Sequence, residues 1–313
     1  MIVPAITDKI QGLQPYLESK IRGQDHVIER FCSILKRGQR GITRDDKPLG
    51  SCLFLGPTGV GKTELTLLAS QYLFGENRLF RFDMSEFLHL DNVKLFMGDE
   101  TGVQGRLGYV LSQHRQGVLL FDEIEKAHRL IWDLFLQMLD AARITLSNHE
   151  TYDLSGFYVI CTSNIGSHHL LRPTRLPFIT LQRVVLSELQ KVFRPELIGR
   201  FTETLVFKPL SPQTQREIAQ IAVGEELNRL KAKGFDFVLS NEAFEFLVRR
   251  GIHKTLGARP LLGVVEKFIG DAICESDAVT GILCPSPKND RLVIGPNRND
   301  TRFKNQYDCS RTN

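Results

Sequence analysis

The feature that most constrains the fold is the glycine-rich segment Gly56-Pro57-Thr58-Gly59-Val60-Gly61-Lys62-Thr63, which fits the phosphate-binding pattern G-x-x-x-x-G-K-[ST]. The apolar run 50–55 before it is typical of a buried strand, and the segment 64–69 after it is typical of a helix. Glycines allow a tight turn whose N–H groups point at phosphate oxygens, and the helix start adds partial positive charge. The segment therefore predicts a nucleotide-binding loop, with Lys62 on the β/γ phosphates and the Thr63 hydroxyl on a magnesium ion.

Composition limits the class of protein. The 313 residues, 42% of them apolar, suffice for one large or two modest domains. We expect a soluble, cytoplasmic protein without a membrane partner, because no run approaches the roughly 20 apolar residues of a membrane span and no leader pattern opens the chain. The six scattered cysteines are predicted to be reduced structural thiols.

The net charge of +4 is too small to indicate nucleic acid as the main partner. Basic residues are densest just before the phosphate-binding segment, and we interpret this cluster as a solvated surface. Its members are Lys36, Arg37, Arg40, Arg44 and Lys47.

Two further apolar strands are predicted to end in polar residues. The run 117–121 is followed by Asp122 and Glu123, and the run 157–161 by Thr162, Ser163 and Asn164. In a parallel α/β sheet such ends lie beside the phosphate loop. Asp122 would hold magnesium and Glu123 would polarise the attacking water, with Asn164 helping to orient it. The alternatives are that the acids cap the next helix and that the asparagine satisfies a turn.

Together these residues resemble the AAA+ superfamily, within it the Clp ATPase family, and specifically the second (C-terminal) ATPase domain of ClpB-type disaggregase chaperones. The resemblance covers about residues 10–295. The matching segments, in order, are 56–65, Asp83-Met84-Ser85-Glu86-Phe87, 122–128, 162–164, 193–200 and 257–261.

The resemblance implies a P-loop three-layer α/β/α parallel sheet with a smaller, mainly helical lid. The expected boundaries are 1–208 for the large subdomain, including N-terminal helices within 6–38, 209–295 for the lid, and 296–313 for a disordered polar tail. It also implies that Asn164 is sensor 1, that Arg259 is sensor 2, and that Arg200 is an arginine finger acting on a neighbouring subunit. Residues 56 to 64, Glu64 included, would contact the nucleotide, and Ile21 would lie near its adenine.

The resemblance implies an ATP-hydrolysing, magnesium-dependent ring motor that remodels or unfolds proteins. It also implies that the ring is a hexamer. No barrel protease is expected, because Ile165-Gly166 is followed by Ser167 in place of a docking tripeptide. We expect the other domains of a full disaggregase to be missing, since they do not fit before Gly56.

Two departures from the family pattern keep other functions open. Val103 stands where a substrate-gripping tyrosine is expected, and Gly199 stands where asparagine is usual before Arg200. The first departure favours a nucleotide-gated assembly or adaptor protein that threads nothing. A third alternative is an AAA+ factor acting on nucleic acid, which only the mild basic bias supports.

Overall fold

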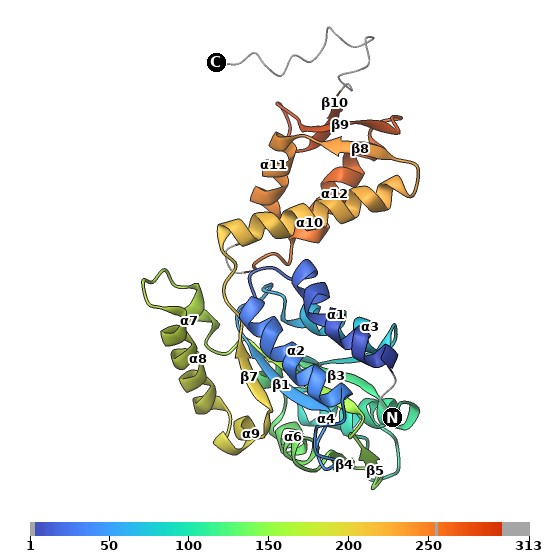
Figure 1. Ribbon diagram of the computed structural model, residues 1–313, viewed down its shortest axis with the longest axis vertical. Helices are drawn as coiled ribbons and strands as arrows, with labels where there is room; N and C mark the ends of the chain where they lie inside the picture. Colours follow the sequence, from blue (N-terminus) through green and yellow to red (C-terminus); the bar gives the residue numbers. More distant parts are fainter. Residues whose placement is uncertain (1–3, 254–255, 296–313) are drawn as a thin grey trace. The chain divides into compact units, whose positions relative to one another are not determined.

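The computed structural model describes residues 4–253 and 256–295. The chain divides after Pro209 into two compact units (Figure 1). The predicted tail 296–313 lies outside the described residues.

The first unit alternates helices and strands. Its helices are α1 (Pro4–Lys20), α2 (Asp25–Gln39), α3 (Lys62–Phe74), α4 (Leu90–Met97), α5 (Arg106–Gln113), α6 (Arg129–Ala141), α7 (Ser167–Leu171), α8 (Phe178–Val192) and α9 (Pro195–Arg200), with short 3-10 helices η1 (Met84–Phe87) and η2 (Ile124–Lys126). Its strands are β1 (Gly50–Leu55), β2 (Leu79–Asp83), β3 (Gly117–Asp122), β4 (Arg143–Thr145), β5 (Thr151–Asp153), β6 (Phe157–Ser163) and β7 (Glu203–Val206).

Five of these strands form a parallel sheet in the order β2-β3-β6-β1-β7. Every residue of β1, β3 and β6 is buried, as expected for strands covered on both faces. The predicted parallel α/β architecture is therefore confirmed. The short antiparallel pair β4–β5 stands apart from this sheet.

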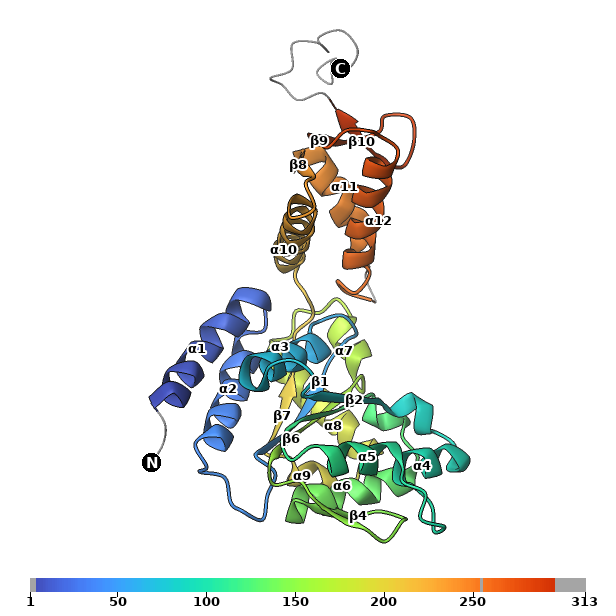
Figure 2. The same cartoon turned by 90° about the vertical axis from the view of Figure 1, so that its right-hand side faces the viewer.

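Helices cover both faces of the sheet, giving three layers (Figure 2). On one face Phe54 of β1 packs edge-on against Phe31 of α2, with ring centroids 5.1 Å apart. On the other face Phe121 of β3 packs edge-on against Phe135 of α6 at 4.9 Å. The Tyr158 hydroxyl of β6 donates a hydrogen bond of 2.7 Å to the carbonyl of Leu35, which fixes α2 to the sheet.

The second unit consists of three helices and a small sheet with their own apolar core. Its elements are α10 (Pro212–Lys231), β8 (Asp236–Leu239), α11 (Asn241–Gly251), α12 (Leu261–Cys274), β9 (Thr280–Pro285) and β10 (Leu292–Gly295). The strand order is β10-β9-β8, so β10 is an edge strand. Ser211 and Ser240 cap α10 and α11 by accepting backbone N–H groups of Thr214 and Ala243 at 3.1 Å.

Three cysteines lie in the core of the first unit. Cys32, Cys52 and Cys161 are fully buried, and burial raises the pKa of all three, that of Cys32 to about 12. They therefore remain thiols, which supports the structural role predicted for them. Across the described helices, none combines the length and apolar character that crossing a membrane requires.

Candidate active site

The predicted phosphate loop joins the end of β1 to the start of α3. Three of its glycines have a positive φ, namely Gly56 at 143°, Gly59 at 75° and Gly61 at 104°. Only glycine adopts such angles without strain, so the loop conformation depends on this spacing. The α3 N-terminus then lies directly behind the loop, where its N–H groups favour an anion.

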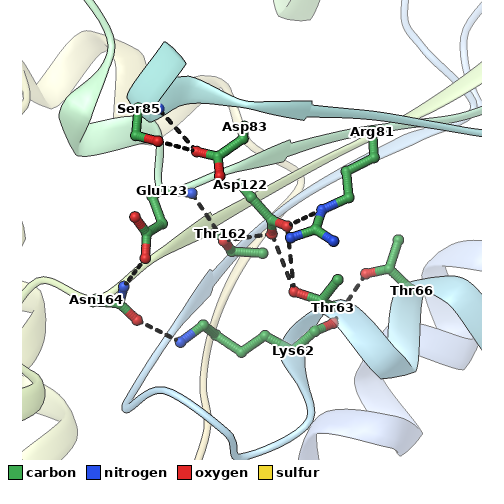
Figure 3. Close-up of polar contacts among 10 residues, drawn as sticks. All are labelled: Lys62, Thr63, Thr66, Arg81, Asp83, Ser85, Asp122, Glu123, Thr162 and Asn164. Atoms are coloured by element: carbon green, nitrogen blue, oxygen red, sulfur yellow. Dashed lines mark hydrogen bonds and ion pairs between the residues drawn. The ribbon is translucent and has the colours of Figure 1, made fainter. Parts of the chain in front are cut away.

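Lys62 is held under the loop rather than in solvent. Its ammonium group donates to the carbonyls of Gly56 and Pro57, the latter at 2.9 Å. It also donates to Oδ1 of Asn164 at 2.9 Å (Figure 3). Burial lowers the pKa of Lys62 to about 8, although Glu125, Asp122 and Glu123 act in the opposite direction. A phosphate is the anion that would restore full charge to this group.

Asp122 ends β3 and is 4% exposed. Its Oδ1 accepts hydrogen bonds from the hydroxyls of Thr63 at 3.2 Å and Thr162 at 2.9 Å, and its Oδ2 accepts one from Arg81 Nε at 2.6 Å. The hydroxyl of Thr63 and the carboxylate of Asp122 thus lie side by side next to the loop (Figure 3).

The oxygen atoms of Thr63 and Asp122 suit magnesium, which prefers hard oxygen ligands and retains several waters. The described part of the chain contains no group of three or more His, Cys, Asp or Glu residues suited to a metal.

Glu123 has a left-handed backbone, with φ 57° and ψ 50°, which is uncommon for a residue other than glycine. Its carboxylate accepts a hydrogen bond from Asn164 Nδ2 at 2.9 Å and pairs with Lys126 at 2.5 Å. Asn164 therefore bridges Glu123 and Lys62. The side chain of Glu123 makes no capping hydrogen bond with η2. Glu123 therefore does not support the alternative in which the two acids cap the next helix.

Several residues of the site were missed by the sequence analysis. Thr162 donates to Asp122 and accepts the backbone N–H of Glu123 at 3.1 Å, while Glu125 accepts the N–H of Asn164 at 2.9 Å. Arg81 pairs with Asp122 from the neighbouring strand β2. Thr162 could have been found from its position at the carboxyl end of a predicted strand. The sequence predicted that this strand ends at Cys161, one residue earlier.

The remaining residues predicted for nucleotide contact fall in three places. Ile21 is buried against the loop, because a Cβ placed on Gly61 would lie 3.6 Å from its Cδ1. Thr58 and Val60 lie in the loop itself, and Glu64 is exposed in the first turn of α3. The structure thus places Ile21 next to the loop, and its contact with adenine stays a prediction.

Neither of the two predicted arginines forms a hydrogen bond or ion pair with this cluster among the described residues. Arg200 ends α9 and pairs with Asp140 of α6. Arg259 belongs to the second unit, where it is exposed in the turn before α12.

Comparisons with known proteins match both units. The family model described as AAA domain (Cdc48 subfamily) matches residues 47–204, and the model of the C-terminal, D2-small domain of ClpB protein matches residues 210–277.

Among curated relatives, heat shock protein 100 of Trypanosoma brucei brucei is 36% identical over 270 residues, covering 84% of this chain and 31% of the relative. Chaperone protein ClpB of Aquifex aeolicus is 38% identical over 275 residues, covering 83% of this chain and 27% of the relative. The chain therefore spans about a third of the length of these relatives.

A solved structure also matches the chain. It is a closed-state cryo-EM reconstruction of Hsp104 with ATPyS and FITC casein, with a TM-score of 0.82 and 28% identity. The match covers 94% of this chain and 52% of that chain.

Proposed function

The chain belongs to the AAA family and carries a second unit of the ClpB D2-small type, and on that premise we propose that it binds and hydrolyses ATP in a ring of identical subunits and uses the energy to remodel proteins. We further propose that it works in the cytoplasm, as a hexamer and without a barrel protease. The names of its relatives, heat shock protein 100 and chaperone protein ClpB, support protein as the substrate.

One observation carries the proposal, namely the continuous hydrogen-bonded cluster that joins Lys62, Asn164 and Glu123 on one side and Thr63 and Asp122 on the other. Lys62 would bind the β/γ phosphates, and Glu123 would accept a proton from the attacking water that Asn164 helps to position. Magnesium, held by Thr63 and by Asp122 through water, would supply Lewis-acid stabilisation of the phosphate charge. Arg200 would stabilise the transition state in a neighbouring subunit, and Arg259 would sense the bound phosphate.

The test is ATP turnover per subunit as a function of protein concentration, at fixed salt and magnesium. Turnover that rises and then saturates supports sites completed between subunits. Glu123→Gln should abolish turnover while ATP stays bound, whereas Lys62→Ala should lose nucleotide affinity. Normal turnover in Glu123→Gln would contradict the assigned role of Glu123.

A second candidate is a nucleotide-gated scaffold that threads no polypeptide. The observation that favours it is Val103, 60% exposed on the loop between α4 and α5, where a valine offers little grip on a polypeptide. Asp99 braces this loop by accepting the N–H groups of Thr101 at 2.9 Å and Val103 at 3.3 Å. Unfolding of a tagged model protein by the assembled chain would favour the motor, and ATP-dependent assembly without unfolding would favour the scaffold.

A further inference from the structure

A charged cavity of about 660 Å³ lies in the first unit, outside the site described above. Four cations line it, Arg37, Arg44, Lys47 and Arg200, beside the single carboxylate of Asp140. Three of these cations belong to the basic cluster that the sequence analysis interpreted as a solvated surface. Arg37 and Arg44 are exposed, in agreement with that interpretation, and the cavity lining also brings all three cations together with Arg200.

Asp140 is shared by two of the cations. Lys47 Nζ lies 3.0 Å from its Oδ1 and also donates to the carbonyl of Leu139 at 3.2 Å, and Arg200 pairs with the same Oδ1. Arg44 is balanced by Asp46 at 2.8 Å. The guanidinium of Arg37 forms no ion pair with any described residue, so the lining keeps two positive charges more than the carboxylates neutralise. Such a surplus suits an anion.

The cavity cannot serve the phosphate loop of its own chain. Its lining residues Ser51 and Thr202 are joined at the start of β1, where Ser51 N donates to Thr202 Oγ1 at 3.1 Å and Thr202 N donates to Ser51 Oγ at 2.9 Å. The phosphate loop begins at the opposite end of this strand. A strand of six residues spans about 17 Å, which separates Arg200 from the chain's own phosphate site.

Arg200 has already been assigned above to the nucleotide of a neighbouring subunit, and we propose that Lys47 is a second cation that acts beside it on the terminal phosphates of that nucleotide. The proposal rests on the proposed ATPase function, since it names a further residue for that reaction. Asp140 holds both cations in place until the phosphate displaces its carboxylate. Lys47 contributes charge alone and transfers no proton, in the way that positive groups stabilise a transferring phosphoryl group.

Self-association in the Glu123→Gln background tests this inference without depending on turnover. The probe is ATP with magnesium, and sedimentation velocity gives the protein concentration at half-assembly. Lys47→Met should raise that concentration about tenfold, because a desolvated charge pair across the interface is lost. Lys191→Met is the matched control, since Lys191 also pairs with a carboxylate, Glu188, but lies outside the cavity. It should leave assembly unchanged.

Asp140→Asn separates an electrostatic role of Lys47 from a structural one. If Lys47 served only to hold Asp140 and the end of α6, Lys47→Met and Asp140→Asn would weaken assembly alike, and the proposal would be wrong. If Lys47 and Arg200 bind a phosphate, Asp140→Asn should leave the half-assembly concentration unchanged or lower it, because no carboxylate then competes with the incoming anion.

A mixing experiment locates the action of Lys47 between subunits. Lys47→Met keeps an intact phosphate loop and Glu123→Gln keeps an intact cavity, so mixed assemblies should hydrolyse ATP several-fold faster than the two separate proteins together. Absence of this recovery would contradict action in trans.

The outcomes also separate this inference from the proposed function. If Glu123→Gln binds no ATP, the proposed function fails and this inference fails with it. If it binds ATP without assembling, the proposed ring and this inference are both overturned, and only the ATP-binding part of the proposed function stands. Assembly with equal midpoints for Lys47→Met and Lys191→Met would remove Lys47 from the interface and leave the ATPase proposal standing.

Discussion

The burial of Lys62 makes nucleotide binding depend on pH. With a pKa of about 8, the free protein loses the Lys62 charge as pH rises above 8, whereas bound phosphates favour the charged form. Binding above pH 8 therefore takes up a proton, and ADP affinity should fall by up to about tenfold per pH unit. Calorimetric titration with ADP, without magnesium and between pH 7 and 9.5, measures this slope.

Lys62→Arg supplies the control for that slope. Arginine stays charged throughout this range, so its ADP affinity, although weaker, should not vary with pH through residue 62. An equally steep slope in Lys62→Arg would assign the proton uptake to another group.

Thr162 connects the two acids of the site through one hydroxyl. Thr162→Val removes the donor to Asp122 and the acceptor for the N–H of Glu123 while keeping the side-chain shape. We expect the unfolding free energy of the first unit to fall by about 1–3 kcal/mol, because polar groups at a buried site lose partners. Turnover should fall by about 10- to 100-fold, as for other supports of metal-binding carboxylates.

Thr162→Ser keeps the hydroxyl and should retain most of the unfolding free energy and most of the turnover rate. Denaturant titration and steady-state hydrolysis give the two readouts. Wild-type turnover in Thr162→Val would show that Asp122 and Glu123 are positioned without the hydroxyl.

At the scale of elements, substituting alanine for two helical glycines of the first unit should change its free energy of unfolding in opposite directions. A Cβ on Gly38 of α2 would lie 2.4 Å from the Tyr158 hydroxyl and 2.6 Å from the Leu49 carbonyl, whereas a Cβ on Gly199 of α9 meets nothing within 4 Å. Gly38→Ala should therefore destabilise the unit by about 1–3 kcal/mol. Gly199→Ala should stabilise it by about 0.5–1 kcal/mol, through helix propensity.

Denaturant titrations of both variants give the two free energies. The sign for Gly199 also bears on Arg200, the next residue along α9, because a firmer helix end holds that guanidinium in place. Destabilisation by Gly199→Ala would indicate an obstruction that the isolated chain does not reveal.

Elements with a strong local pattern were predictable from the sequence, and long-range pairings were not. The apolar run of β1 was placed with its observed bounds, since turn residues flank it. The strand β7 was missed, because its four residues become a strand only by pairing with β1. The same holds for the insertion of β6 between β1 and β3, which brings Thr162 beside Asp122.

In the site, the sequence predicted the residues whose chemistry is set by a local motif. The pattern from Gly56 to Thr63 and the acids after β3 were found in this way, and the structure brings them together. Arg81 lies outside such motifs, and its contact with Asp122 follows only from the pairing of β2 with β3. The role of Lys47 likewise depends on its distance from Asp140, which lies 93 positions further along the chain.

At the scale of the whole molecule, every predicted nucleotide-binding residue lies in the first unit except Arg259. That arginine is exposed, and its side chain makes no hydrogen bond or ion pair with another described residue. An unengaged guanidinium before the start of α12 suits a ligand phosphate. We therefore expect the second unit to contribute to ATP binding through this one side chain.

Arg259→Ala should weaken ATP binding about tenfold in the Glu123→Gln background, the usual effect of losing one charged contact. ADP binding should change much less, because the contact predicted for Arg259 is with the terminal phosphate. Arg249→Ala is the control, since Arg249 is also exposed in the second unit and only donates to the Glu245 carbonyl of its own helix at 3.3 Å. Titrations with ATP and ADP give the ratio of affinities. If Arg259→Ala and Arg249→Ala leave that ratio equally unchanged, nucleotide recognition is confined to the first unit, and the second unit must act on the cycle through assembly instead.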